Sequence, residues 1–248
     1  MSDLITGIIP ARAGSVRVPN KNKLILGGHP MIAYTIESAR QSGVFNKLLL
    51  ATDDEETIEM GIHYGVDEVF KRDVSDSSST SLDIQWLTNL YTNHKIDSKY
   101  FAILRPTSPL RSVNLITECV RQYFDSACDS LRTISLVQEH PGKMWRLGSD
   151  GIAQPYLAQQ LGQPASHAMQ YGSLETLYVQ TSVFEIARTE VILNTKSREG
   201  KSIYGFITSG VDSFAIDTPS DLEFLEFLIA KNSELLPKIL KKPFRLSK

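Results

Sequence analysis

The sequence lacks the features that mark several large classes of protein. Only two cysteines occur among its 248 residues, Cys119 and Cys128, and neither belongs to a CxxC motif or a Cys/His cluster. A zinc site and a disulfide framework are therefore not expected. No stretch approaches the roughly 18 consecutive apolar residues that a transmembrane helix needs. The apolar run near the N-terminus has no basic segment before it and no small-residue cleavage site after it, unlike a signal peptide. We therefore expect a cytoplasmic protein with no membrane partner.

An excess of charge of either sign is also missing. The chain has 26 Lys and Arg against 28 Asp and Glu, a net charge of -2 at pH 7, so no overall field attracts a nucleic acid. Its 42% hydrophobic and 22% charged residues are ordinary for a globular protein. We predict a single domain, residues 1–248, that does not bind nucleic acid.

Short apolar runs alternate with amphipathic segments through the first half of the chain. Strands are predicted at 4–10, 47–51, 66–70 and 100–104, and helices at 30–42, 55–64, 82–93 and 113–125, with Gly43 and Gly65 ending the first two helices. The first of these strands, 4–10, is a short continuous apolar run, as in a parallel sheet that helices cover on both faces. This order predicts an α/β, Rossmann-like fold with a mostly parallel central sheet.

The middle of the chain, from about residue 136 to 200, changes character. It contains a polar, Gln-rich stretch and short strand-like runs such as 174–179, so we expect a small excursion from the core. A last strand is predicted at 214–217 and a terminal helix at 219–232, with Thr218 before Pro219 as its cap.

Ligands of open α/β sheets bind outside the carboxyl ends of the strands. That rule brings the segments 11–22, 52–53 and 105–111 to one edge of the sheet. The first of them holds Arg12, Gly14, Ser15, Arg17 and Lys21, and backbone N–H groups with guanidinium forks suit a triphosphate. It is neither a Walker loop nor a GxGxxG turn. The residues alone leave two interpretations open, a phosphate-binding loop or a solvated basic loop.

Two other features are equally open. Asp217 follows an apolar run and is a candidate magnesium ligand, but Asp217 and Asp53 also stand where helix-capping residues stand. Arg105, Thr107, Ser108 and Arg111 surround two prolines, which suits polar contacts to a base or a sugar. Such serines and threonines commonly bond only to nearby backbone.

Five ordered blocks resemble the acylneuraminate cytidylyltransferases (CMP-sialate synthetases) and, more distantly, the CMP-Kdo synthetases. The blocks are IPARAGSVRVPNKN at 9–22, LLLATDDEETIE at 48–59, SSSTSLD at 77–83, LRPTSPLR at 104–111 and FAIDTPSDLE at 214–223. They span nearly the whole chain in the expected order.

The resemblance implies a Rossmann-like nucleotidyltransferase fold whose middle excursion, about 136–200, forms a homodimer interface near the neighbouring site. It also implies a reaction in which the hydroxyl of an acidic sugar, a nonulosonate or a Kdo-like molecule, attacks the α-phosphorus of CTP. Pyrophosphate leaves and Mg²⁺ offsets the charge. We expect the product to serve a bacterial surface glycan, a lipopolysaccharide or capsule.

The resemblance also assigns residues. Arg12, Lys21 and Asp217 are expected in catalysis, and Asp217 as the metal ligand. The expected nucleotide-binding residues are Ala11, Arg12, Gly14, Ser15, Arg17, Lys21, Asn22, Ser81, Arg105 and Arg111. The expected sugar-binding residues are Thr107, Ser108, Tyr171 and Gly172.

The chain departs from the family pattern at four places. Val16 stands where sialate synthetases usually have Lys, and Arg105 replaces the Gln of LQPTSP. Ala215 replaces the first Asp of a DID pair, and Tyr171-Gly172 stands where an Asn-Gly contacts the sugar. Two further hypotheses follow: an enzyme that uses another nucleoside triphosphate or sugar, and a nucleotide-binding subunit without catalytic activity.

Overall fold

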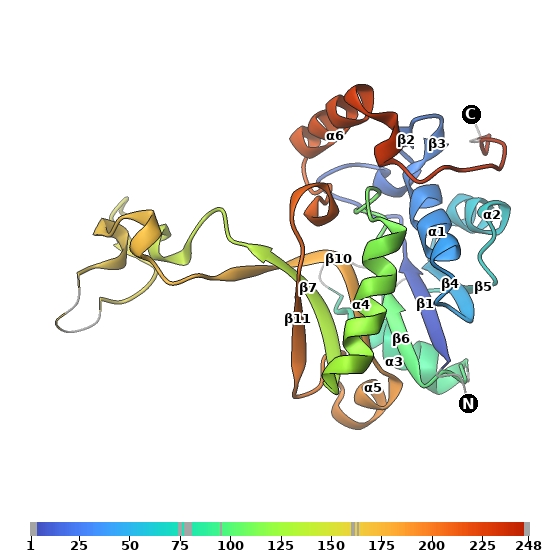
Figure 1. The fold of residues 1–248 in the computed structure, drawn as a ribbon, viewed down its shortest axis with the longest axis horizontal. Helices are drawn as coiled ribbons and strands as arrows, with labels where there is room; N and C mark the ends of the chain where they lie inside the picture. The colour runs from blue at the N-terminus through green and yellow to red at the C-terminus, as the bar shows by residue number, and fades with distance from the viewer. Residues whose placement is uncertain are drawn as a thin grey trace.

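A seven-stranded sheet forms the centre of the protein (Figure 1). The computed structural model describes residues 4–73, 76, 81–94, 96–159, 162 and 164–245. Within them the strand order is β11-β7-β10-β6-β1-β4-β5. The strands are β1 Ile5–Pro10, β4 Lys47–Thr52, β5 Glu68–Lys71, β6 Tyr100–Ile103, β7 Ser130–Leu136, β10 Tyr178–Arg188 and β11 Ile203–Ile207.

Most neighbouring strands run parallel. β1 pairs in parallel with β4 and β6, β4 with β5, and β7 with β11. β10 is antiparallel to both β6 and β7. The predicted α/β fold with a mostly parallel sheet is therefore confirmed.

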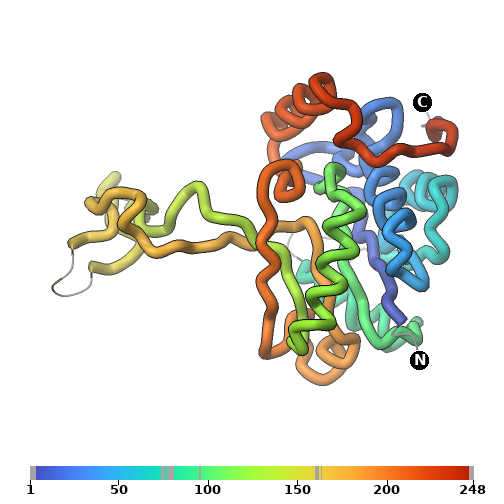
Figure 2. The backbone as a smooth tube through the Cα atoms, in the orientation of Figure 1, coloured from blue at the N-terminus to red at the C-terminus, as the bar shows by residue number. Residues whose placement is uncertain are grey.

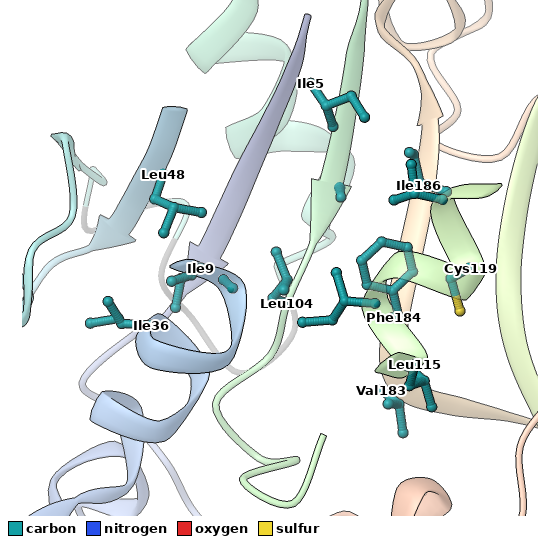
Figure 3. Packing of buried hydrophobic residues seen from close by; sticks show 14 of the residues in the cluster. Ile5, Ile9, Ile36, Leu48, Leu104, Leu115, Cys119, Val183, Phe184 and Ile186 are labelled. Carbon is teal, nitrogen blue, oxygen red and sulfur yellow. The ribbon is translucent and has the colours of Figure 1, made fainter. Parts of the chain in front are cut away.

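Helices cover both faces of the sheet. They are α1 Met31–Ser42, α2 Glu55–Tyr64, α3 Asp83–Asn93, α4 Val113–Ser126 and α5 Thr189–Thr195. The last helix, α6 Pro219–Lys231, packs in a separate apolar cluster with residues such as Leu26 and Tyr34. One apolar cluster joins α1, α2 and α4 to one face, and Figure 3 shows Ile9, Ile36 and Leu48 meeting there. A second cluster packs α3 and α5 against the other face through residues such as Trp86 and Ile192. Gly43 and Gly65 end α1 and α2 at φ 66 and 96, as predicted.

Residues 214–217 do not form the predicted strand. They follow the 3-10 helix η6 Gly210–Ser213 and make no ladder with the sheet. The Ile216 N–H instead donates to the carbonyl of Thr107 at 2.8 Å, and the Ile216 side chain is buried. An apolar run is equally compatible with a buried loop, so periodicity did not separate the two structures. The predicted Thr218 cap of α6 is confirmed, with the Thr218 side chain accepting from Asp221 N–H.

β7, β10 and β11 were not predicted as core strands. β7 carries Arg132 and Thr133 among its apolar residues, and the predicted excursion at 136–200 overlaps β10 and α5. Beyond the sheet, the described residues between 137 and 177 (137–159, 162 and 164–177) project as an extended arm (Figure 2). The arm contains the antiparallel pair β8 Trp145–Leu147 and β9 Ala153–Pro155. No helix in the described ranges is long and apolar enough to cross a membrane.

Candidate active site

A cavity of about 280 Å³ lies at the carboxyl ends of β1, β5 and β6. Five basic side chains and two carboxylates face it among its described lining, which makes it suited to a polyanion. We call it the basic cavity. Its lining residues are Pro10, Arg12, Ser15, Arg17, Lys21, Asn22, Arg72, Ser81, Asp83, Arg105, Pro106, Thr107 and Asp217.

The loop after β1 is fixed from two sides. Ala13 N–H donates to Oδ1 of Asp53 at 2.8 Å, and the Asn22 amide donates to the carbonyl of Arg12 at 3.2 Å. The cap of α2 is Asp54, whose Oδ2 accepts from Thr57 N–H at 2.9 Å. Asp53 is thus neither the helix cap nor a member of the cavity wall; it holds the backbone of the predicted phosphate-binding loop.

Lys21 and Arg17 converge on Asp217. Lys21 Nζ lies 2.6 Å from the carbonyl oxygen of Ile216 and 3.4 Å from Asp217 Oδ1, and Arg17 Nη2 lies 3.0 Å from the same Oδ1. Lys21 is only 7% exposed. Burial lowers the pKa of Lys21, and the charge of Asp217 and a hydrogen bond to it oppose that shift.

Not every residue expected at the nucleotide lies on the cavity wall. Arg12, Ser15, Arg17, Lys21, Asn22, Ser81 and Arg105 line it. Ala11 is buried and pairs through its N–H with the carbonyl of Ala51. Gly14 belongs to the same loop but is not part of the lining.

Arg111, predicted to contact the nucleotide, is not part of the described wall of the basic cavity, and the contact stays a prediction. Its Nε donates to the carbonyl of Val183 at 2.5 Å and its Nη2 to the carbonyl of Arg105 at 2.7 Å. The side chain is fully buried, and that burial lowers the pKa of Arg111. It supports the 104–111 loop from below. Thr107 lines the basic cavity, whereas Ser108 is buried behind it.

Two charged cavity residues, Arg72 and Asp83, were missed from the sequence. Arg72 is 6% exposed, its guanidinium lies 5.0 Å from the centre of the Trp86 ring, and its Nε is buried without a hydrogen-bond partner. Burial lowers the pKa of Arg72, while the carboxylates of Asp83 and Asp53 oppose the shift. Arg72 follows β5 directly, so the rule that ligands bind at the carboxyl ends of strands could have found it. Asp83 belongs to the 77–83 block, of which residues 77–80 lie outside the described residues.

A larger cavity of about 1040 Å³ adjoins the first and shares Asp217 with it. The base of the arm, η6 and α6 form its walls, with Val211, Phe214, Phe224 and Leu228 among the apolar side chains. We call it the apolar cavity. Its described lining includes Glu139, Asp217 and Asp221 but no Lys, Arg or His.

Tyr171 and Gly172, expected at the sugar, lie in the arm and line neither cavity. The Tyr171 hydroxyl contacts the carbonyl oxygens of Val137 and Gln138 at 3.1 and 2.7 Å. Within a single chain these contacts connect two segments of the arm.

The described residues contain no group of three or more His, Cys, Asp or Glu side chains placed to hold a metal ion. Asp217 is the carboxylate common to both cavities. Magnesium is commonly held by one or two carboxylates, with substrate phosphates and water completing its shell. The donor set therefore fits a magnesium ion that arrives with a triphosphate, and it does not form a site made of protein ligands alone.

Known proteins resemble this chain over most of its length. It is 32% identical over 217 residues to an N-acylneuraminate cytidylyltransferase of Streptococcus agalactiae, covering 86% of this chain and 50% of the relative. It is 28% identical over 237 residues to the CMP-N,N'-diacetyllegionaminic acid synthase of Legionella pneumophila, covering 94% and 99% of the two chains. The chain thus spans about half the length of the streptococcal relatives it matches.

A solved structure of a CMP:2-keto-3-deoxy-manno-octonic acid synthetase complexed with CTP has the same fold. The TM-score is 0.67 at 17% sequence identity, and the match covers 92% of this chain and 99% of that one. A family model described as Cytidylyltransferase matches residues 6–241. The chain therefore belongs to the cytidylyltransferase family.

Proposed function

We propose that the protein transfers CMP from CTP to the hydroxyl of an acidic sugar, a nonulosonate or a Kdo-like molecule, and releases pyrophosphate. The observation that carries this proposal is the position of Asp217. It belongs to both cavities, and Lys21 and Arg17 hold it at their junction. A phosphate group in the basic cavity and a hydroxyl in the apolar cavity would meet beside it.

The chemistry asks the protein mainly to position charges. The sugar oxygen forms a bond to the α-phosphorus and gives up its hydroxyl proton to water, and the bond from that phosphorus to the bridging oxygen of pyrophosphate breaks. Arg12, Ser15 and Lys21 bind the phosphates, with Arg17 in the place of the missing lysine at Val16. Fixed donors of this kind stabilise charge that develops in the transition state. The nucleoside is bound by other residues of the cavity wall: Asn22, Arg72 and Ser81.

Asp217 would hold Mg²⁺ together with the triphosphate. When bound, the ion neutralises charge on the phosphate oxygens. In the described structure, the positively charged side chains of Arg17 and Lys21 contact Asp217 Oδ1 and balance the charge of this carboxylate.

A homodimer is part of the proposal. The arm exposes apolar side chains, among them Trp145, Leu147, Ile152 and Tyr156, and exposed apolar patches commonly mark interfaces. An acidic acceptor needs a cation, but the described lining of the apolar cavity has none. Lys143 and Arg146 of the arm are candidates to supply it to a second copy. We also propose a cytoplasmic location, because the proposed reaction needs a nucleoside triphosphate, and a surface lipopolysaccharide or capsule as the destination of the product.

Pyrophosphate release tests the proposal directly. The assay combines CTP, UTP, GTP or ATP with a panel of acidic sugars in the presence of Mg²⁺ or Mn²⁺. We expect release with CTP and at least one sugar, and a larger rise in melting temperature with CTP than with the other nucleotides. No release with any combination would overturn the enzymatic proposal, and an equal thermal shift with all nucleotides would overturn the choice of CTP.

Ala215 supports a second candidate function, a subunit that binds CTP without turning it over. Ala215 lies on the wall of the apolar cavity, two residues before Asp217, where the family pattern has another carboxylate. This candidate predicts CTP binding without pyrophosphate release, and recovery of metal-dependent release in Ala215→Asp. Release by the unmodified protein would eliminate it.

A further inference from the structure

Arg105 stands where the family pattern has Gln. Its positive charge is paired with carboxylates of the protein. Its Nη2 lies 2.5 Å from Asp83 Oδ2 and 3.5 Å from Glu185 Oε1. Burial alone would lower the pKa of Arg105, but these two carboxylates raise it. The guanidinium therefore faces the basic cavity already paired with carboxylates.

These ion pairs extend into a cluster of six partly or fully buried side chains. Glu185 also pairs with Arg132 at 2.9 Å and with Arg198 at 3.2 Å, while Arg198 pairs with Asp83 at 2.8 Å. Glu199 completes the set through Arg132 and Arg198. No member's side chain is more than 28% exposed. We call this set the ionic cluster: Asp83, Arg105, Arg132, Glu185, Arg198 and Glu199.

The ionic cluster has three arginines and three carboxylates, so its formal charges cancel. Arg105 consequently adds little net positive potential with which to attract a triphosphate. Its contribution is geometric, because a guanidinium bonded to two carboxylates has a fixed orientation. Sheet register explains the cluster, since Glu185 is the cross-strand neighbour of both Arg132 and Ile103, two residues before Arg105.

The Arg105–Asp83 pair connects two segments of the cavity wall. Asp83 begins α3 and accepts from Trp86 Nε1 at 3.0 Å as well as from Arg105. Ser81, two residues earlier, lies on the same wall. Arg105 is therefore linked through Asp83 to the start of α3 and, along the backbone, to Ser81.

We propose that Arg105 is a positioning residue for the nucleoside end of the substrate, holding Ser81 and the start of α3 in place through Asp83 while Glu185 orients it. This inference rests on the proposed function. It differs from a direct anion contact, in which the positive charge of Arg105 itself would bind phosphate or the acceptor carboxylate.

Substitution of Glu185 distinguishes a positioning role of Arg105 from a direct anion contact by Arg105, because Glu185 lines neither cavity. The test compares Arg105→Gln, Glu185→Gln and the double variant, which removes one charge of each sign and keeps the ionic cluster neutral. Arg121→Gln is the matched control, since Arg121 forms exposed ion pairs on α4 with Glu118 and Asp125. Kd for CTP, KM for CTP and for the acceptor, kcat and melting temperature are measured for each protein.

We expect Kd and KM for CTP to rise about tenfold in all three variants, with kcat and the acceptor KM within about twofold of the unmodified protein. The double variant should melt close to the unmodified protein because its cluster stays neutral. Unchanged CTP affinity in the double variant overturns the inference, as does a rise in the acceptor KM alone. Unchanged CTP affinity in Glu185→Gln together with a loss in Arg105→Gln shows a direct contact and also overturns it. If the unmodified protein binds no CTP, the proposed function fails and this inference fails with it.

Discussion

Lys21 Nζ lies 3.4 Å from Oδ1 of Asp217, a residue 196 positions later in the chain. This contact joins the loop after β1 to the start of α6 at the point where the two cavities meet. Lys21 also donates to the buried carbonyl of Ile216. One side chain therefore has both a structural and a proposed catalytic role.

Lys21→Gln is expected to lower kcat/KM at least about 100-fold, because a fixed positive charge beside the phosphates is lost. Stability should fall by about 1–3 kcal/mol as the Ile216 carbonyl loses a charged donor. Pyrophosphate release and urea unfolding measure the two effects. Lys23→Gln is the control, since Lys23 belongs to the same turn but pairs with Asp54 and Glu56 away from the cavity. Equal losses of activity in both variants would contradict the assignment.

Arg111→Met should destabilise the protein by about 2–4 kcal/mol, because the buried carbonyls of Val183 and Arg105 lose their donor. Urea unfolding measures this change, and CTP affinity is measured in the same preparation. A loss of CTP affinity at unchanged stability would support the sequence-based prediction that Arg111 contacts the nucleotide.

Acid stability should depend on Asp83. Burial alone would raise the pKa of Asp83, but the charges of Arg105 and Arg198 lower it. A carboxyl with a lowered folded-state pKa contributes stability above its unfolded-state pKa, about 3.9, and that contribution is lost as pH falls through the folded-state value. Below about pH 4 the unmodified protein should therefore lose more unfolding free energy than Asp83→Asn. Parallel stability curves for the two proteins would be evidence against this ion pairing, and Asp97→Asn, an exposed site, is the control.

Asp217→Asn is expected to raise the magnesium concentration at half-maximal activity by at least about tenfold, because a neutral amide is a weaker ligand. A magnesium titration of pyrophosphate release measures it. Asp221→Asn is the matched control: Asp221 lines the apolar cavity too, but its Oδ2 accepts from the N–H groups of Asp217 and Thr218. A similar shift in both variants would mean that Asp217 acts only through the local fold.

Leu147→Ser in the arm should weaken the proposed dimer by about tenfold or more without changing the monomer fold, because Leu147 is 75% exposed in a single chain. Sedimentation equilibrium measures the association. Ile62→Ser on α2, also exposed, controls for a general effect of removing surface apolar groups. A monomeric unmodified protein at all concentrations would exclude the dimer.

Local patterns predicted much of the first half of the fold. The helices at 30–42 and 55–64 end at Gly43 and Gly65, because a left-handed residue at the end of a helix is a local requirement that glycine meets. The strands at 4–10 and 47–51 were also recognisable, since strands buried on both faces are apolar throughout. β7 and β10 escaped recognition because Arg132 and Glu185 are polar residues that only their cross-strand pairing makes tolerable inside the sheet.

For the site, the sequence alone determined which segments carry charge and which edge of a parallel sheet they share. The basic loop at 11–22, the 105–111 loop and Asp217 were identified without coordinates. Only the tertiary structure decided what each charge faces. Arg12 lines the cavity whereas Arg111 supports it from beneath, and Arg105 is neutralised by Asp83 and Glu185. The reason is physical. Residue type and spacing indicate the local secondary structure, but the net effect of a charge depends on partners that the fold brings together from distant positions.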